Sequence, residues 1–469
     1  MRRMRRNKNR SRLKNEQGVV ITLVAVFMLG VIGAMAALSI DVVTLYTARS
    51  EAQLAADAAA LAGARVLANS GMTSTFNAST TVGDNAAPLA MAVATQVAAS
   101  STVGGRTLNP GASPCVAGQE ICVNIVTTGV DFVANPQVTV QVQRTDLPTF
   151  FARIWGTTQL KVAASATAEA YNPSSLQGTG GGPGLPIAPM CVKPWLLPNL
   201  DPSNPGKPIF FAASGALAPT TTNLLGYITP AAPGSTRFRT VCAAPSGNTD
   251  CSGPTPTPTV WKYYPGTTDA TTGSFPAPSD TSCAGCAGFT PYQLSIAGCV
   301  QTPIACSSQV NVDITAYPTR DTETATAVNT LTHATAAANS GDSVDTAEPI
   351  PPGGNYPFQF LAGSENPVVL SGAMAAQTQV AVSDSLVTVP VIDTTTAWPP
   401  TSTTYPTVQI IGFVQLFLNP TGTQAPADGH IHTQVINIVG CGTPGAGGVA
   451  GQAILGNGAS AVAVRLIHP

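Results

Sequence analysis

The sequence predicts an α+β protein in which an N-terminal transmembrane helix continues into a small α+β head, followed by a β-rich, disulfide-containing second domain. Three observations lead to this fold class. Residues 17–40 contain no charged residue, and all 40 prolines follow residue 87, which leaves room for one long N-terminal helix. The rest of the chain alternates short apolar strands with stretches rich in Thr, Gly, Pro and Cys, a pattern typical of β structure with long loops.

The first 40 residues have the charge pattern of a membrane anchor. Residues 1–16 contain eight basic residues and one acidic residue, and the 24-residue run 17–40 exceeds the roughly 20 residues that a bilayer core requires. Basic flanks stay on the cytoplasmic side, so the chain after residue 40 is predicted to be extracytoplasmic. The alternative is a signal peptide cleaved near Ala34-Met35-Ala36, although the apolar part of such a peptide is usually about 7–15 residues long.

The helix is predicted to continue past the membrane, with one face of small residues. Alanines recur there in steps of three and four, the spacing of a single helical face, while Glu51 lies off that face and is expected to tolerate substitution. The candidate helix-packing residues are Ala52, Ala55, Ala59 and Ala62. A similar small-residue face inside the span comprises Gly30, Gly33, Ala34 and Ala37. Such faces permit close packing of another helix or of the head, whereas the simpler explanation is the helix propensity of alanine.

The head is predicted to combine strands with a short helix. Its strands are expected at residues 120–126, 137–145 and 160–170. In the second of these, Val138, Val140 and Val142 alternate with polar residues, which indicates a strand buried on one face. A short helix is expected between the last two strands, starting near Asp146 and ending at Gly156.

The remaining chain is predicted to be β-rich with one further helix. A Gly/Pro/Ser-rich stretch separates it from the head, a composition typical of a linker. The helix is expected over residues 322–338, and strands are expected at 309–315, 385–393, 408–418, 431–440 and 461–467. The predicted organisation is a basic cytoplasmic tail (1–16), a transmembrane helix (17–40), a helix with an α+β head (41–171), a linker (172–189) and a β-rich extracytoplasmic domain (190–469).

All ten cysteines follow the predicted anchor, and their number is even, as expected for disulfides in an oxidising compartment. Short spacing favours the local pairs Cys115 with Cys122 and Cys242 with Cys251. The remaining candidate disulfide cysteines are Cys283, Cys286, Cys299 and Cys306. Their spacing is also close to that of a structural zinc site with four thiolates, and Cys283-Ala-Gly-Cys286 has the form of a redox motif. Outside the cytosol we expect disulfides.

The sequence predicts no enzyme, no cofactor and no metal site. It contains neither HExxH nor GxSxG, and Pro183 occupies the position of the third glycine in the one stretch that approaches GxGxxG. Outside the basic tail, acidic residues outnumber basic ones by 22 to 13, which argues against nucleic acid as a partner. No small-molecule substrate is indicated.

The N-terminal helix resembles the corresponding segment of TadG-like proteins of the bacterial Tad/Flp pilus-assembly system. The matching features are Gln17-Gly18 at the start of the span, Asp41 at its outer end, Tyr46 and Arg49, and the block QLAADAAALAGA (53–64). The strand–helix–strand over 137–170 is similar to a segment that often follows in these proteins. Residues 190–469 carry no pattern of a known family.

The resemblance implies a single-pass inner-membrane protein that helps to assemble or anchor a Tad-type pilus by binding other pilus-assembly proteins. Two departures limit it. The DxSxS metal motif of the von Willebrand factor A-like domain found in many TadG-like proteins is missing. The fifth residue after Gly18 is Leu23, where pseudopilins have the glutamate of their processing site. The alternatives are a membrane-tethered surface or adhesion protein unrelated to pili, and a secreted enzyme behind a cleaved signal peptide.

Overall fold

A computed structural model gives the arrangement of most of the helices and strands. It describes residues 9–74, 81–110, 115–116, 118–126, 135–172, 187–200, 207–212, 237–240, 260–268, 274–275, 283, 285–313, 317–334, 344–347, 360–380, 382–394, 405–420, 422, 424–425, 427, 429, 431–441, 452–453 and 461–467. The structure confirms the predicted α+β fold class, because a long apolar N-terminal helix precedes several sheets and disulfide-bonded segments.

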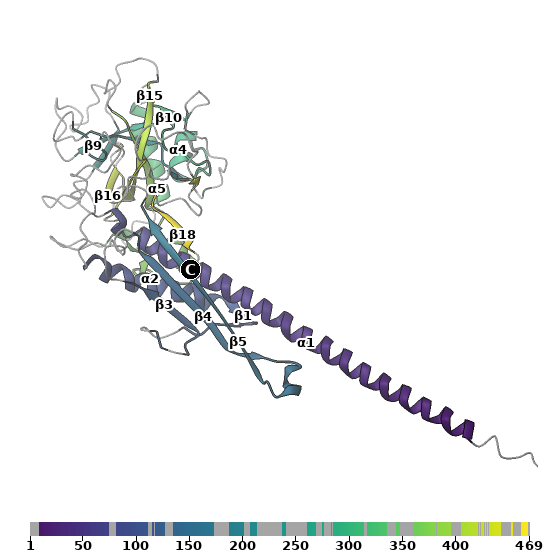
Figure 1. The fold of residues 1–469 in the computed structure, drawn as a ribbon. Helices are drawn as coiled ribbons and strands as arrows, with labels where there is room; N and C mark the ends of the chain where they lie inside the picture. Colours follow the sequence, from purple (N-terminus) through teal and green to yellow (C-terminus); the bar gives the residue numbers. More distant parts are fainter. Residues whose placement is uncertain are drawn as a thin grey trace, which may run out of the picture.

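Helix α1 (Asn9–Ala68) is an unbroken helix of 60 residues. Figure 1 shows its N-terminal half projecting from the molecule and its C-terminal half packed in the head. The helix ends before Gly71, whose φ of 78° is a left-handed conformation that favours glycine. After the short 3-10 turn η1 (Met72–Ser74), helix α2 (Thr81–Ser100) packs on α1, and the first proline, Pro88, lies inside α2.

The head contains a four-stranded antiparallel sheet in the order β18-β5-β4-β3. Its strands are β3 (Ile121–Ile125), β4 (Gln137–Pro148), β5 (Gln159–Tyr171) and β18 (Ala463–Ile467). Val138, Val140 and Val142 are fully buried in one cluster with α1 and α2, as their alternation predicts. The last strand of the chain therefore completes the sheet next to β5, pairing Ala463 with Tyr171.

The short helix predicted from Asp146 is wrong. Strand β4 continues through Asp146 to Pro148, and only η2 (Ala152–Trp155) is helical, as a 3-10 turn. Asp146 binds Arg144 instead of capping a helix. Gly156 ends the turn as expected, with a φ of 87° and its N–H bonded to the carbonyl of Arg153. The two remaining strands of this region, β1 (Thr102–Val103) and β2 (Arg106–Thr107), form a tight hairpin after α2.

The β-rich domain that follows the head, called the body below, contains a seven-stranded mixed sheet in the order β10-β15-β14-β7-β9-β8-β16, in which β16 also pairs with β15. This last pairing closes six of its strands on themselves. The strands are β7 (Trp195–Pro198), β8 (Arg237–Thr240), β9 (Val260–Pro265), β10 (Gln309–Asn311), β14 (Leu386–Ile392), β15 (Thr407–Leu418) and β16 (Ile431–Gly440). Every residue of β14 is buried, because Trp195, Tyr263 and aliphatic side chains fill one face of the sheet and the head lies against part of the other.

Smaller elements surround this sheet. They are β6 (Ile187–Ala188) with β17 (Gln452–Ala453), the strands β11 (Thr346–Ala347), β12 (Phe360–Leu361) and β13 (Gln379–Val380), and the helices α4 (Pro291–Ala297), α5 (Tyr317–Leu331) and α6 (Pro367–Leu370). The helix predicted over 322–338 thus starts earlier and ends earlier, at Leu331, and residues 335–338 lie outside the described chain.

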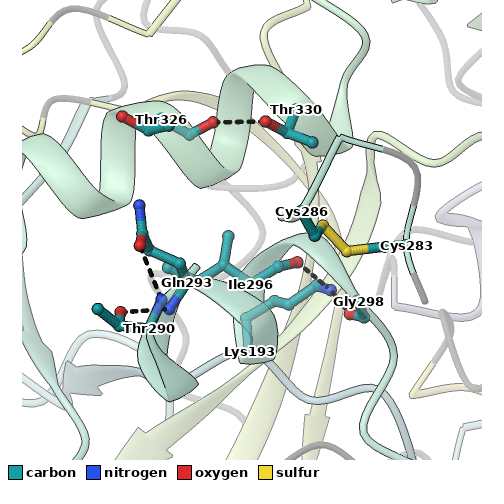
Figure 2. Close-up of a disulfide and its surroundings, with 9 residues drawn as sticks. All are labelled: Lys193, Cys283, Cys286, Thr290, Gln293, Ile296, Gly298, Thr326 and Thr330. Carbon is teal, nitrogen blue, oxygen red and sulfur yellow. Dashed lines mark hydrogen bonds between the residues drawn. A yellow bond between two sulfur atoms is a disulfide. The ribbon is translucent and has the colours of Figure 1, made fainter. Parts of the chain in front are cut away.

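Helix α4 shows how local sequence fixes a short helix. Thr290 and Gln293 form a capping box at its start, with Pro291 in the first turn. At its other end the buried Lys193 donates to the carbonyls of Ile296, at 2.5 Å, and Gly298, at 2.7 Å (Figure 2). Burial lowers the pKa of Lys193 to about 7, and the charge of Asp384 opposes that shift.

The C-terminal end of α1 is joined to the body by buried amides. Asn437 Nδ2 donates to the carbonyl of Ala68 at 2.7 Å, and Gln415 Nε2 donates to Asn69 Oδ1 at 3.1 Å. Asn437 also donates to Gln415 Oε1 at 2.6 Å, which satisfies both buried side chains. Head and body consequently share one core cluster, in which Phe413 of β15 lies with the alanines of α1.

Candidate membrane anchor and its junction with the head

The N-terminal half of α1 exposes large apolar side chains on all sides. Within the described chain, only the helical segment Val19–Ala68 of α1 has the length and composition to cross a membrane. Exposed fractions reach 69% for Phe27, 75% for Leu29 and 70% for Met35. An apolar surface of this extent marks a protein or membrane contact, and its all-round distribution is that of a helix in lipid.

The few hydroxyl groups at the end of the apolar run are bonded to their own helix. Ser39 Oγ donates to the carbonyl of Ala36 at 2.7 Å, and Thr47 Oγ1 donates to that of Val43 at 3.0 Å. Thr44 does the same with Asp41 at 2.8 Å. Polar groups in or near lipid require internal partners, so these three hydroxyls are compatible with a membrane boundary.

The predicted small-residue face of the span is only partly covered. A Cβ built on Gly30 or Gly33 meets nothing within 4 Å. Ala34 is half-buried and Ala37 is 8% exposed, so the head reaches this part of the helix. The structure therefore divides the face into two glycines open to the surroundings and two alanines next to the head.

The predicted helix-packing alanines lie in the buried half of α1. Ala52, Ala55 and Ala59 are at most 2% exposed and share a cluster with α2 and the β4–β5 sheet, whereas Ala62 is half-buried. The sequence reasoning missed Gly63, where a Cβ would lie 2.9 Å from Val138 Cγ1 and 3.3 Å from the Ala90 carbonyl. The glycine in the block AADAAALAGA was the available clue, because α1 and α2 approach closely there. A functional role of this face stays a prediction.

Asp41 joins the exposed half of α1 to the head. Its carboxylate accepts hydrogen bonds from the backbone N–H of Phe150 at 2.9 Å, Phe151 at 3.0 Å and Ala152 at 2.6 Å. Desolvation raises the pKa of Asp41, but the three N–H donors outweigh it, so the pKa lies below its usual value. The end of the β4–β5 hairpin is thereby fixed to the residue that follows the uncharged run.

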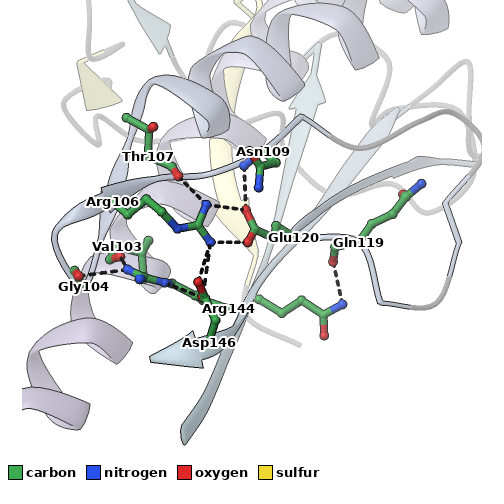
Figure 3. A network of polar contacts seen from close by, with 10 residues as sticks. Val103, Gly104, Arg106, Thr107, Asn109, Gln119, Glu120, Arg144 and Asp146 are labelled. Atoms are coloured by element: carbon green, nitrogen blue, oxygen red, sulfur yellow. Dashed lines mark hydrogen bonds and ion pairs between the residues drawn. The ribbon is translucent and has the colours of Figure 1, made fainter. Parts of the chain in front are cut away.

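A second polar network holds the β1–β2 hairpin against β3 and β4 (Figure 3). Arg106 pairs with Glu120 and with Asp146, and Arg144 Nε binds Asp146 at 2.8 Å. The hydrogen bond from Arg106 lowers the pKa of Glu120, and the hydrogen bond from Arg144 lowers that of Asp146. Each carboxylate is therefore charged and paired at neutral pH.

Glu51 is more than a solvated residue beside the alanine face. Its Oε2 accepts a 2.6 Å hydrogen bond from the N–H of Gly104, which has a φ of 58°. This contact connects α1 to the β1–β2 turn. Glu51 is consequently a poor neutral control for substitutions on the alanine face.

The eight cysteines in the described chain are all in disulfides. The pairs are Cys115–Cys122, Cys191–Cys299, Cys283–Cys286 and Cys306–Cys441. The predicted local pair has a Cα–Cα distance of 5.3 Å, whereas Cys242 and Cys251 lie outside the described residues. The four-thiolate zinc alternative is not assembled, because Cys299 and Cys306 bond to distant partners. The described residues contain no group of three or more potential metal ligands.

A comparison with known protein families found a match for the N-terminal helix. Residues 18–66 match the model described as putative Flp pilus-assembly TadE/G-like. No curated protein and no solved structure matches the chain. The matched segment contains the exposed apolar half of α1, Asp41 and the alanine-rich buried half, and the description names pilus assembly instead of a catalytic class. The match confirms the predicted resemblance of the N-terminal helix to TadE/G-like Flp pilus-assembly proteins and supports a pilus-related role.

Proposed function

We propose that this protein is a non-enzymatic component that helps to assemble or anchor a Tad/Flp-type pilus through contacts with other pilus-assembly proteins. It is a single-pass protein of the bacterial inner membrane. The basic tail is cytoplasmic, and the head and the body are extracytoplasmic. The observation that carries the proposal is the family match over residues 18–66. These residues lie within α1, whose N-terminal half projects from the molecule and whose C-terminal half packs in the head.

The structure supports the membrane part of this proposal through the contrast within α1. Large side chains such as Leu29 are exposed before Asp41, and small side chains such as Ala59 are buried after it. Basic residues before the span favour a cytoplasmic N-terminus. Disulfides in the described chain favour an oxidising compartment for the remainder.

The domain division is part of the same proposal. We propose the same limits for tail, span, head and body as the sequence predicts, with residues 172–189 as the linker. Residues 173–186 lie outside the described chain, and Ile187–Ala188 at the end of the linker form β6. Strand β18 is added to the head, because Ala463–Ile467 pair with β5. The chain therefore runs from the head into the body, and its C-terminal strand returns to the head.

Within the membrane, we expect partner proteins to contact the span at its two uncovered glycines. Gly30 and Gly33 lie on one helical face with nothing within 4 Å of a built Cβ, so a second transmembrane helix has room for close backbone approach. Binding there requires no small molecule and no cofactor.

The test is pilus assembly in cells that lack the chromosomal gene. We expect loss of pili in the deletion strain and recovery with the wild-type gene. Gly33→Leu should reduce recovery at normal protein level, whereas the neighbouring change Ile32→Leu, on an exposed and already large side chain, should restore pili fully. Normal pili in the deletion strain would exclude the pilus-assembly role.

A further inference from the structure

The end of the β4–β5 hairpin lies at the level where the uncharged run of α1 ends. Asp41 is the first charged residue after 17–40, and it holds the backbone of Phe150, Phe151 and Ala152. Figure 1 shows β4 and β5 running beside α1, with their connection pointing toward its N-terminal half. The hairpin end is therefore fixed at the outer boundary of the proposed span.

The buried surface of α1 extends from Asp41 toward the N-terminus of the helix. Ala37 is 8% exposed and Ala34 is half-buried, and both lie on the helical face of Asp41. Met35, on another face, is 70% exposed. Seven residues of helix correspond to about 10 Å, so part of the head lies alongside the last two turns of the span.

The hairpin end has a fixed conformation and an exposed aromatic side chain. Thr149 Oγ1 donates to the carbonyl of Thr157 at 2.7 Å, which closes the loop, and Gly156 ends η2 in a left-handed conformation. Phe150 is nevertheless 61% exposed. Because the backbone N–H of Phe150 is bonded to Asp41, the main chain is fixed there while the ring remains exposed.

Two exposed basic residues lie close to the hairpin end along the chain. They are Arg153 in the turn and Lys161 near the start of β5. The carboxylates of this region have other partners, since Asp41 binds three amides and Asp146 binds Arg144 and Arg106. Aromatic rings with adjacent long cationic side chains are the composition that settles at a membrane–water interface, where the cations reach lipid phosphates.

We propose that the hairpin end, Thr149–Thr157, enters the headgroup layer of the extracytoplasmic leaflet, with Phe150 as its apolar anchor and Arg153 and Lys161 on lipid phosphates. The proposal rests on the proposed membrane anchoring of α1. It adds a second membrane contact that fixes the tilt of the head above the bilayer, because the hairpin and α1 are tied together at Asp41.

Depth-dependent quenching of the full-length protein tests this contact. The protein is reconstituted in phosphatidylcholine–phosphatidylglycerol vesicles that contain nitroxide-labelled lipids, either shallow or deep. Single cysteines for a fluorescent label are placed at Thr158, which is exposed beside the turn and leaves Phe150 intact, at Leu29 in the span and at Leu370 in the body. The unsubstituted protein measures background labelling.

We expect the label at Thr158 to lose fluorescence with shallow nitroxides and the label at Leu370 to lose none. Adding Phe150→Asp, which replaces the apolar ring with a charged side chain, should reduce the loss at Thr158 without changing the deep quenching at Leu29. Quenching at Leu29 with none at Thr158 would overturn the hairpin contact alone. No quenching at Leu29 would overturn the span and the hairpin contact together, and an unchanged loss after Phe150→Asp would overturn the anchoring role of Phe150.

Discussion

The two halves of α1 lie in opposite surroundings. Between Val19 and Val43 the large side chains are exposed, whereas from Ala48 to Ala68 the face turned to the head is almost fully buried. Before Asp41 the helix carries Val, Leu, Ile, Phe and Met and, over residues 17–40, no charge. After Asp41 its buried face is mainly Ala, and its exposed positions include charged residues such as Arg49. In the proposed anchor the large side chains contact lipid, whereas the small ones after Asp41 permit α2 and the sheet to approach the backbone.

One uninterrupted helix thus changes its surroundings at Asp41, where the side chains become smaller and charged residues begin. Gly63 is the extreme case, since a single added carbon would meet Val138 and Ala90. Asp41 marks the change of environment, because its carboxylate requires the amide donors that the hairpin supplies. Four predictions test this division, in order of decreasing effect.

The largest effect is expected from a charge in the exposed half. Leu29→Arg places a charge near the middle of the span, where insertion scales assign a cost of about 2.5–3.5 kcal/mol. We expect the protein to be lost from carbonate-washed membranes; the same holds for Val26→Arg. Leu54→Arg, at a position that is 71% exposed but beyond Asp41, should remain in the membrane fraction. Equal retention of all three variants would mean that the exposed half is not in lipid.

A larger side chain in the buried half should destabilise the head. Ala59→Leu adds three carbons at a fully buried position, and overpacking typically costs about 1–3 kcal/mol. Ala58→Leu is the matched control, because Ala58 is exposed on the same helical turn. Thermal unfolding in detergent should separate the two variants. Equal melting temperatures would show that the buried half tolerates volume as the exposed half does.

Asp41→Asn should loosen the boundary between the halves. An amide keeps one acceptor oxygen but places an NH2 group against a backbone donor, so the three hydrogen bonds cannot all form. We expect hydrogen exchange at Phe150–Ala152 to accelerate by about tenfold or more. Asp57→Asn is the control, since the carboxylate of Asp57 accepts from Gln53 within the helix. Unchanged exchange at the hairpin in Asp41→Asn would remove Asp41 as the junction.

The smallest effect is a loss of head stability in acid. Glu120, Asp146 and Asp41 have pKa values below their ordinary ones, so their contribution is complete above about pH 5 and is lost as pH falls through the lowered values. Ion pairs that are partly exposed contribute little to stability, so the effect should be small. Amide protection factors in β2 and β3, which correct for the intrinsic pH dependence of exchange, should therefore fall below pH 4, with a weaker pH dependence in Glu120→Gln. An identical pH profile in that variant would exclude the Arg106–Glu120 pair as its source.

Local features of the fold could be predicted from the sequence. The alternating valines of β4 indicate a strand, and the uncharged run indicates the exposed helix, because each depends on neighbouring residues only. The short helix at Asp146 was wrong because the ion pair with Arg144 and the pairing with β5 extend the strand. Tertiary contacts outweighed a local helix-start pattern there.

Long-range contacts could not be predicted. Nothing in Ala463–Ile467 names β5 as its partner, and the disulfide Cys306–Cys441 spans 135 residues. Cysteine spacing pointed to Cys115–Cys122 because the two are seven residues apart. At the junction, the sequence indicates Asp41 as the first charged residue after the uncharged run. Its partners at Phe150–Ala152 could not be predicted, because they lie more than 100 residues away.

The central claim is that α1 passes from lipid into the extracytoplasmic head at Asp41. Single cysteines at Leu29 and Leu54, both highly exposed in the isolated protein, test it most directly through labelling of intact spheroplasts with a membrane-impermeant maleimide. The account predicts that Leu54→Cys is labelled without lysis and that Leu29→Cys stays unlabelled even after lysis, until detergent removes the lipid. Labelling of Leu54→Cys only after lysis, or of Leu29→Cys in intact spheroplasts, would contradict it.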